Sequence, residues 1–326
     1  MCASRCQDFK GFQLIKTWNT GPLLADSCGY IVVSHPPYPK RIIVAFRGTY
    51  SITNTIIDLS TVPQEYVPYP ENGKIDRKDG KTRKCTDCTV HAGFMMSWRN
   101  TRSEILPELE ILVDQYLDYQ VTLVGHSLGG AVAALAGLEF KGKGWNPKVT
   151  TFGEPKIGNE GLMKYIDQAF PNHDRIPEKN MYRRVTHLND PVPLLPLKEW
   201  NFKMHAGEIH ISKPDLSPQV QDLQHCDGDE DILCISGADP PVVKSKALGD
   251  DDSNQVVETL LQESDLAELW SEARTAMAFP ARFKLWQLFF SHRDYFWRLG
   301  LCIPGGDPLN WHIKYPPPED ESHHEL

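Results

Sequence analysis

The chain has 326 residues, of which 24% are charged, and a formal net charge of −9 at pH 7. This length allows one large hydrophobic core in one or two domains. The negative charge argues against a nucleic-acid partner and against a general attraction to anionic membranes. No apolar run approaches the roughly 18 residues that span a bilayer, so we expect no transmembrane segment.

The first part of the chain indicates strands joined by turns. An opening helix or strand from Phe9 leads to the strand Tyr30–Val33 and then to a proline-rich turn. The nearly continuous apolar run Arg41–Phe46 is typical of a strand that is covered on both faces. Residues 63–84 are rich in proline, glycine and charge, so we expect a long surface loop there.

A short amphipathic helix is predicted directly after Thr49. Its apolar residues recur at helical spacing, so they share one face of the helix. They are Ile52, Ile56, Ile57 and Leu59.

A long amphipathic helix is predicted from Phe94 to Tyr119. Pro107 lies inside it and is expected to kink it, because proline removes one main-chain hydrogen bond. The buried stripe is expected to comprise Ile105, Leu109, Leu112 and Tyr116.

The most informative stretch runs from Val121 to Leu138. It begins with β-formers, passes through Gly-His-Ser-Leu-Gly and continues as an Ala/Leu run of high helix propensity. This pattern predicts a strand, a sharp turn and a helix, with Ser127 strained at the apex and small residues at Gly125 and Gly129. The alternative is a serine that only caps a buried helix.

Further strands are predicted at Val149–Phe152 and Tyr182–His187, and an outer strand at Glu208–Ile211. Strands that alternate with helices, without an internal repeat, predict an α/β fold with a mostly parallel sheet and helices on both faces.

The last third of the chain differs in composition. Residues 237–279 form an insertion with an acidic turn and a predicted helix from Gln255 to Met277. Phe283–Trp297 is dense in aromatic residues and predicts a buried helix. The core then comprises about residues 9–236 and 280–303 of a single domain, and residues 313–326 are a polar tail.

The eight cysteines bear on the compartment. Six lie close together as local pairs, which favours disulfides and an oxidising compartment over a zinc or redox site. The first residues contain no hydrophobic core of a signal peptide, so we expect an intracellular protein or one whose export segment is absent from this chain. The local pairs are Cys2 with Cys6, Cys85 with Cys88, and Cys226 with Cys234, and Cys28 and Cys302 are left over.

A serine at such a turn becomes a nucleophile when a histidine takes its proton and an acid orients that histidine. In serine-elbow hydrolases the acid and then the histidine follow the serine along the chain. Asp190 is favoured as the acid because it follows the predicted strand Tyr182–His187, whereas Asp174 and Asp215 follow no convincing core strand.

The chain order leaves several histidines as candidates for the base. His187 lies too close to Asp190 in sequence, and His205 and His210 precede or lie on an outer strand. His292, in its aromatic setting, is only modestly ahead of His205.

Two main-chain N–H groups are needed to stabilise the oxyanion. Leu128, directly after the serine, is expected to supply one, and Thr49, in the loop after the strand Arg41–Phe46, the other.

Together these stretches resemble the class 3 lipases, the fungal-type triacylglycerol lipase family, and secreted yeast lipases look most similar. The matching motifs follow the family order from about residue 30 to 302. They are Phe46-Arg-Gly-Thr49 with Ser51 and Asp58-Leu59, Cys85-Thr-Asp-Cys88 with His91-Ala-Gly-Phe94, Gly125-His-Ser-Leu-Gly-Gly130, Phe152-Gly-Glu-Pro155 with Gly158-Asn159, Arg184-Val-Thr-His187 with Asp190-Pro-Val-Pro, and His292 with Tyr295-Phe296.

The resemblance implies a single α/β-hydrolase-like domain without a metal or organic cofactor. It implies Ser127, Asp190 and His292 as the triad, which decides against His205, and Thr49 and Leu128 as oxyanion residues. It also implies a secreted protein, expected to be a monomer. A bond between Cys28 and Cys302 is only suggested, because the family's usual partner for Cys302 is missing here.

The resemblance further implies an enzyme that hydrolyses triacylglycerol at an oil–water interface. The apolar helix after Thr49 would then be a lid that covers the site in water. A carboxylesterase or feruloyl-type esterase for smaller soluble esters is the main alternative, and a non-catalytic lipid-binding protein is a weaker one.

Overall fold

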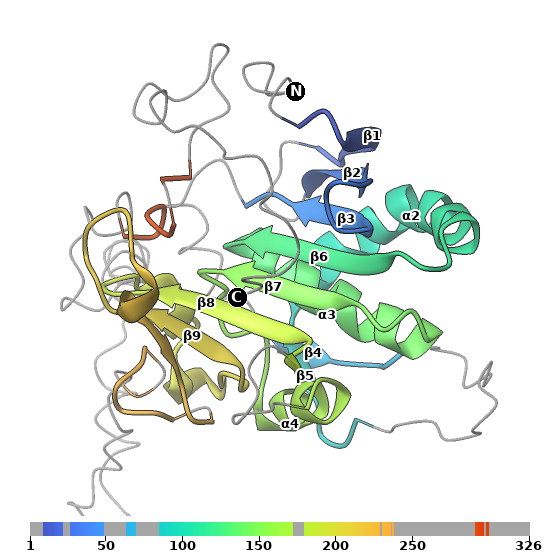
Figure 1. Ribbon diagram of the computed structural model, residues 1–326. Coiled ribbons are helices and arrows are strands. Elements are labelled where there is room, and N and C mark those ends of the chain that lie inside the picture. The colour runs from blue at the N-terminus through green and yellow to red at the C-terminus, as the bar shows by residue number, and fades with distance from the viewer. Residues whose placement is uncertain are drawn as a thin grey trace, which may run out of the picture.

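The structure is a computed structural model that describes residues 9–21, 27–48, 63–69, 85–171, 179–228, 230–235, 237, 291–296 and 298–299. These residues build an eight-stranded sheet and a two-stranded sheet, with helices packed against the larger one (Figure 1). The predicted helices after Thr49 and from Gln255 to Met277, the insertion 237–279 apart from Gly237, and the tail 313–326 lie outside the described residues.

The strands of the large sheet follow the order β1-β2-β3-β6-β7-β8-β9-β10. From β3 to β9 each strand runs parallel to its neighbour, and antiparallel strands complete both sides. A mostly parallel sheet is therefore confirmed. The strands are β1 (Phe12–Asn19), β2 (Cys28–Ser34), β3 (Arg41–Phe46), β6 (Gln120–His126), β7 (Lys148–Phe152), β8 (Tyr182–His187), β9 (Glu208–Ile211) and β10 (Leu223–His225).

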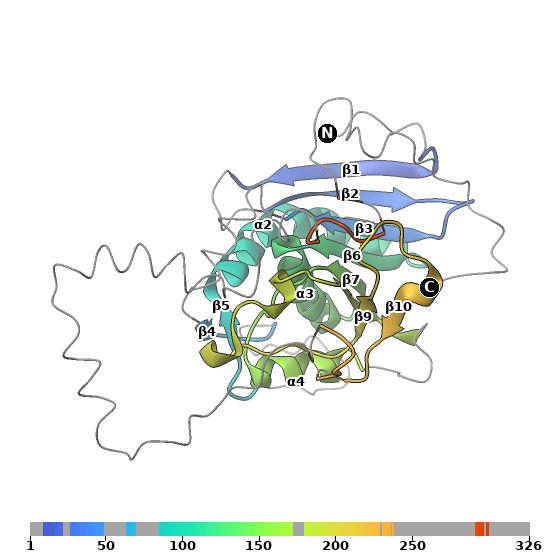
Figure 2. The same ribbon diagram turned by 90° about the vertical axis from the view of Figure 1, so that its left-hand side faces the viewer.

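Three long helices are described: α2 (Ala92–Gln115), α3 (Leu128–Lys143) and α4 (Glu160–Ala169). The α3 helix lies against β3, β6 and β7, and α2 and α4 flank it on the same face of the sheet (Figures 1 and 2). Most of α3 is buried, as its Ala/Leu composition predicts for a helix that is enclosed on all sides.

The long helix α2 begins two residues before the predicted start and ends four residues before Tyr119. Its first turn is capped by His91, whose Nδ1 accepts a hydrogen bond from the Phe94 N–H. Pro107 lies inside the helix. The predicted buried stripe is confirmed for Ile105, Leu109 and Leu112, whereas Tyr116 is the C-cap and only half-buried.

Three details of the prediction are wrong. The stretch expected to be a surface loop begins with the short strand β4 (Pro63–Glu65), which pairs with β5 (Thr89–His91). The strand β9 is not outermost, because β10 pairs with its free edge. Residues 291–296, expected to lie in a helix, form turns and bends. The other residues of that predicted helix, 283–290 and 297, lie outside the described residues.

Two predicted disulfides are present, Cys85–Cys88 and Cys226–Cys234. Because the sulfurs of Cys85 and Cys88 are bonded to each other, they are not available as zinc ligands. Cys28 lies in β2, and the remaining cysteines, Cys2, Cys6 and Cys302, lie outside the described residues. Within the described part of the chain, no helix combines the length and apolar character needed to cross a membrane.

Candidate active site

The predicted turn after β6 is sharp, and Ser127 is its strained residue. Ser127 has φ 57° and ψ −129°, which a residue with a side chain adopts only when its surroundings impose it. Its N–H donates to the carbonyl of Phe152 at 2.9 Å, which fixes the turn to β7. The Ser127 side chain makes no capping hydrogen bond to α3, so the interpretation as a simple helix cap is wrong.

Glycines allow strand, helix and neighbouring loop to approach one another at this turn. A Cβ atom on Gly125 would collide with the main chain of Gly129, and one on Gly129 would collide with the main chain of Phe46. Glycine at these two positions therefore lets the main chains of β3, β6 and α3 approach one another. This contact places Ser127 at the carboxyl ends of the parallel strands, which point to the left in Figure 1.

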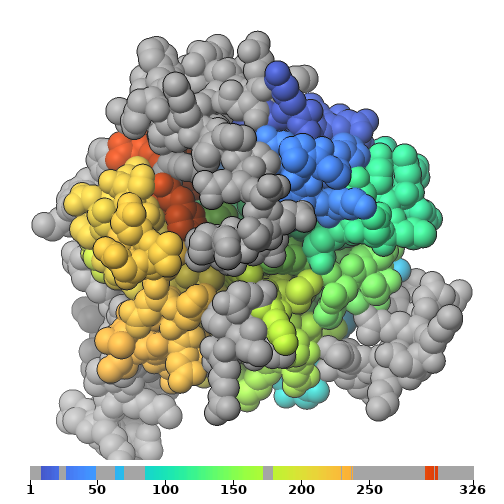
Figure 3. Space-filling model, viewed as in Figure 1, coloured from blue at the N-terminus to red at the C-terminus, as the bar shows by residue number. Residues whose placement is uncertain are grey.

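Asp190 and His292 are brought together across 102 residues of sequence. Nδ1 of His292 lies 3.0 Å from Oδ1 and 2.9 Å from Oδ2 of Asp190, and both side chains are buried. Because an ionised carboxylate only accepts, the His292 Nδ1 carries the hydrogen. The red segment with His292 lies beside the yellow part of the chain in the space-filling view (Figure 3).

Two further donors fix the Asp190 carboxylate. The Tyr295 hydroxyl donates to Oδ2 at 2.5 Å, and the Val192 N–H donates to Oδ1 at 2.9 Å. Burial by itself would raise the pKa of Asp190, but the charge of His292 and these hydrogen bonds outweigh it and lower the pKa below its ordinary value. Asp190 therefore remains an anion at neutral pH.

The other ring nitrogen of His292 is the atom that would accept a proton from a serine. Nε2 of His292 is buried and makes no hydrogen bond among the described residues. The ring of His126, the residue before Ser127, packs on the His292 ring with the centroids 4.4 Å apart. The histidine is therefore held beside the serine turn, with its proton-accepting nitrogen uncommitted.

Gly153 provides the space for this arrangement. It has φ 56°, and a Cβ at this position would lie 2.6 Å from the Tyr295 hydroxyl, 2.8 Å from Cε1 of His292 and 2.9 Å from Oδ2 of Asp190. A side chain here would displace Asp190, His292 and Tyr295 together.

The predicted oxyanion residues lie partly within the described structure. Leu128 is the first residue of α3, where main-chain N–H groups have no acceptor within the helix and the helix dipole favours negative charge. Gly48 lies close to the serine, because a Cβ on it would be 3.1 Å from Cβ of Ser127. Thr49 and the predicted lid residues Ile52, Ile56, Ile57 and Leu59 lie outside the described residues.

The competing candidates are placed elsewhere. The Nε2 of His205 lies 3.1 Å from Glu154, and its Nδ1 lies 2.8 Å from the carbonyl of Ala206. Both ring nitrogens are thus occupied in a buried polar cluster. Asp215 is exposed, and Asp174 lies outside the described residues.

Sequence reasoning missed the parts played by Tyr295 and His126. Both stood inside motifs that were noticed, but nothing in the spacing indicated that the tyrosine would reach Asp190 or that His126 would pack on His292. Both contacts join residues more than a hundred positions apart.

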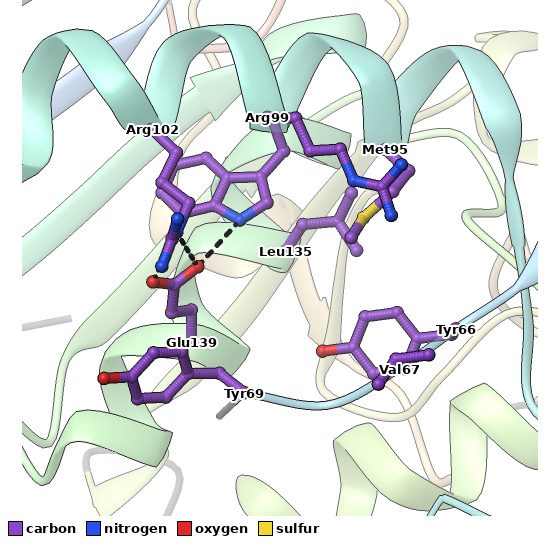
Figure 4. Close-up of a pocket in the computed structure, with 9 residues that line it drawn as sticks. Tyr66, Val67, Tyr69, Met95, Arg99, Arg102, Leu135 and Glu139 are labelled. Atoms are coloured by element: carbon purple, nitrogen blue, oxygen red, sulfur yellow. Dashed lines mark hydrogen bonds and ion pairs between the residues drawn. The ribbon is translucent and has the colours of Figure 1, made fainter. Parts of the chain in front are cut away.

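A pocket of about 180 Å³ lies away from these residues, between the segment 66–69 and the helices α2 and α3 (Figure 4). Glu139, in its wall, accepts hydrogen bonds from Arg102 and Trp98. Glu139 lies twelve residues beyond Ser127 in the chain, or about 18 Å along a helix. The pocket is therefore separate from the Asp190–His292 pair.

One cluster of metal-ligating residue types occurs in the described part of the chain, formed by Glu208, Cys226 and Cys234. Its two cysteines are joined in a disulfide, so their sulfurs are not available as thiolate ligands.

Comparison with known protein families gives a consistent result. The model of the family described as Lipase (class 3) matches residues 43–200, which include the serine turn and Asp190. The chain is 52% identical to the secreted mono- and diacylglycerol lipase 2 of Gibberella zeae, over 95% of this chain and 77% of that protein. It is 50% identical to lipase A of Sodiomyces alcalophilus, over 96% of this chain and 78% of that protein.

Among solved structures, the Lip2 lipase of Yarrowia lipolytica is similar, with a TM-score of 0.63 and 31% identity. The match covers 73% of this chain and 79% of the yeast protein.

Proposed function

This chain belongs to the class 3 lipase family, and from that premise we propose that it hydrolyses acylglycerol esters with Ser127 as nucleophile, His292 as general base and Asp190 as the acid that orients the base. The observation that carries the proposal is the buried pair of Asp190 and His292 beside the strained serine. Nδ1 of His292 is committed to Asp190, and its Nε2 has no hydrogen-bond partner among the described residues.

The reaction follows from these positions. His292 Nε2 takes the proton of the Ser127 hydroxyl as the oxygen attacks the ester carbonyl, and the buried anion of Asp190 stabilises the imidazolium that forms. The tetrahedral intermediate then collapses, and the alcohol leaves with the proton from His292. Water attacks the acyl-enzyme by the same route and releases the fatty acid.

The oxyanion of the intermediate is proposed to accept hydrogen bonds from the main-chain N–H groups of Leu128 and Thr49. Support comes from the position of Leu128 at the start of α3 and from the closeness of Gly48 to Ser127. Each such donor contributes about 3 kcal/mol to the stability of the transition state in serine hydrolases.

The substrate is proposed to be a lipid ester presented at an oil–water interface. The apolar residues after Thr49 favour triacylglycerols as substrates. The name of the Gibberella zeae relative adds mono- and diacylglycerols as candidates. We propose that this protein accepts partial acylglycerols as well as triacylglycerols, that the apolar segment acts as a lid, and that the protein is monomeric.

The compartment is proposed to be extracellular. The two disulfides among the described residues suit an oxidising environment, and the relative from Gibberella zeae is named as secreted.

The test combines a substrate series with identification of the nucleophile. Monoolein, diolein and triolein emulsions are supplied to the purified chain, and fatty-acid release is titrated. A p-nitrophenyl phosphonate is then reacted with the enzyme, and the labelled peptide is identified by mass spectrometry. We expect stoichiometric label on Ser127 and parallel loss of activity on all three lipids. Label on another residue, or activity that survives full labelling, would contradict the proposal.

Arg99→Ala is the matched control, because Arg99 lies in the wall of the separate pocket (Figure 4). This variant is expected to retain wild-type activity and labelling. A loss of activity in it would indicate that the lipid binds in the separate pocket.

A further inference from the structure

His126 has a role in the structure beyond its place in the serine motif. It is the last residue of β6, and its side chain lies on the side of the strand end that faces His292. Its Nε2 lies 2.6 Å from the main-chain carbonyl oxygen of His292, across 166 residues of sequence. A carbonyl oxygen only accepts hydrogen bonds, so the Nε2 of His126 must carry the hydrogen.

The two rings also pack on each other. Their centroids lie 4.4 Å apart with the planes 37° from parallel, and the Tyr295 ring meets His126 edge-on at 5.9 Å. On its other side His126 borders the loop after β3, since a Cβ on Gly48 would lie 3.4 Å from the His126 Nδ1. One side chain thus contacts the loop that carries the base and the loop that leads to Thr49.

His292 is restrained at two separate points. Asp190 holds its ring through Nδ1, and His126 holds its main chain through the carbonyl oxygen. Among the residues that the structure describes, the His126 bond is the one that ties the main chain of His292 to the central sheet. Fixing Nδ1 alone would leave the ring able to swing about that contact, whereas the second point fixes where Nε2 is directed.

We propose that His126 is a positioning residue for the hydrolysis reaction, which holds His292 in register with Ser127 by its hydrogen bond to the His292 carbonyl. The proposal rests on the proposed function, in which His292 is the general base. His126 touches neither substrate nor reacting atoms, and it acts through the placement of the base.

The protonation state of His126 suits this role. Burial, together with repulsion from the charge of His292, lowers its pKa to about 3, although the charge of Asp190 and the bond to the carbonyl act in the opposite direction. Arg293 also lowers it. His126 therefore stays neutral while His292 gains and loses protons during the reaction, and its single N–H remains directed at the same carbonyl.

Two substitutions separate the hydrogen bond from the packing. His126→Phe keeps a ring against His292 but removes the donor. His126→Gln places an amide N–H at the same number of bonds from Cβ as the histidine Nε2–H, so it restores the donor. Thermal unfolding of both variants shows whether the fold is kept, and active-site titration with a p-nitrophenyl phosphonate counts the competent sites.

We expect His126→Phe to lower kcat per titrated site by roughly ten- to hundredfold, because small displacements of a base from its reactive geometry cost rates of this order. Its KM should stay within about twofold of wild type, and the rate constant of phosphonylation should fall in parallel with kcat. His126→Gln should regain most of the lost rate.

Wild-type kcat per titrated site in His126→Phe would overturn the proposal, even if fewer sites were titrated, because that result indicates a role in folding only. Equal impairment of both variants would also overturn it, because the donor would then not matter. Failure of the proposed function is a different result: in that case the phosphonate would not label Ser127 in the wild-type protein.

Discussion

Tyr295 donates its hydroxyl hydrogen to Oδ2 of Asp190 at 2.5 Å, the same oxygen that lies 2.9 Å from Nδ1 of His292. Tyr295 and His292 come from one short segment, so a single loop supplies both the imidazole and a donor that fixes the carboxylate partner of the imidazole. The placement of Asp190 is therefore coupled to the docking of this loop.

Tyr295→Phe should weaken both stability and activity. It removes a hydrogen bond to a buried charge, which costs about 1.5–3 kcal/mol of unfolding free energy. Because the hydroxyl helps to lower the pKa of Asp190, the folded-state pKa should rise towards its ordinary value. The stability that ionised Asp190 contributes is present above the ordinary carboxyl pKa and is lost as the pH falls through the folded-state pKa.

The acid unfolding midpoint of Tyr295→Phe should therefore shift to higher pH, as measured by circular dichroism between pH 2 and 7, a range set by the ordinary pKa of about 4. Phe296, in the same loop and only half-buried, offers a comparison: Phe296→Leu should leave the midpoint close to wild type. An unchanged midpoint in Tyr295→Phe would show that the hydroxyl does not stabilise the carboxylate.

Ser127→Ala and Ser127→Gly should both abolish ester hydrolysis, to below about a thousandth of the wild-type rate. They should differ in stability. The positive φ of Ser127 strains any residue with a Cβ, and glycine relieves that strain. We expect the unfolding free energy of Ser127→Gly, measured in urea, to be about 0.5–2 kcal/mol higher than that of Ser127→Ala. Equal stability would show that the turn stores no strain at this residue.

Gly125→Ala should destabilise the protein by about 3 kcal/mol or more, because its new methyl group would collide with the main chain of Gly129, which cannot move without shifting α3. Gly142→Ala is the control, since its nearest contacts at 3.2–3.3 Å are with the half-buried Tyr69 and require only a small shift. That change should be neutral or stabilising by up to about 1 kcal/mol. Urea unfolding of both variants measures the difference, and similar losses would argue against the close contact.

Replacing the Cys226–Cys234 disulfide by two serines should lower the unfolding free energy by about 2–3 kcal/mol, as expected for closure of so short a loop. The Cys226 N–H donates to the carbonyl of Glu208 in β9, so the loss should loosen the β9 edge first. Hydrogen exchange at β9 and β10 would show this. Unchanged hydrogen-exchange protection in β9 and β10 would show that the disulfide does not stabilise this edge of the sheet.

The hydrolysis rate of a triacylglycerol should rise sharply when its concentration crosses the solubility limit, if the apolar segment after Thr49 is a lid. The reason is that such a segment hides its apolar face in water and exposes it at a lipid surface. p-Nitrophenyl butyrate, kept below its own solubility limit, is the control. A rate on the soluble ester that saturates before droplets form, with no rise on the triacylglycerol, would make the protein an esterase.

The strand–turn–helix around Ser127 was predictable because three local signals agree there: β-formers, glycines and an Ala/Leu run. Asp190 was predictable for a related reason, since a carboxylate that directly follows a buried parallel strand lies at the carboxyl ends of the strands, where ligands bind. In both cases the information is contained in a window of about twenty residues.

His292 could not be chosen from the residues alone, because its neighbours in space come from β6 and the loop after β8, more than a hundred positions away. The aromatic stretch around it suggested a helix, but burial in this region comes from tertiary contacts. Tyr295 turns inward to reach Asp190, and the segment forms turns instead of a helix. The resemblance to a known family, and not the periodicity, favoured His292 over His205.

The spacing along the chain also orders events during synthesis. Each described strand of the large sheet is complete by residue 225, when Ser127 and Asp190 have already been synthesised, whereas His292 follows Asp190 by 102 residues. At about 5–20 residues per second, His292 is synthesised roughly 5–20 seconds after Asp190. A nascent chain shorter than 292 residues therefore lacks the proposed base, and the onset of ester hydrolysis would report the docking of the loop that carries His292.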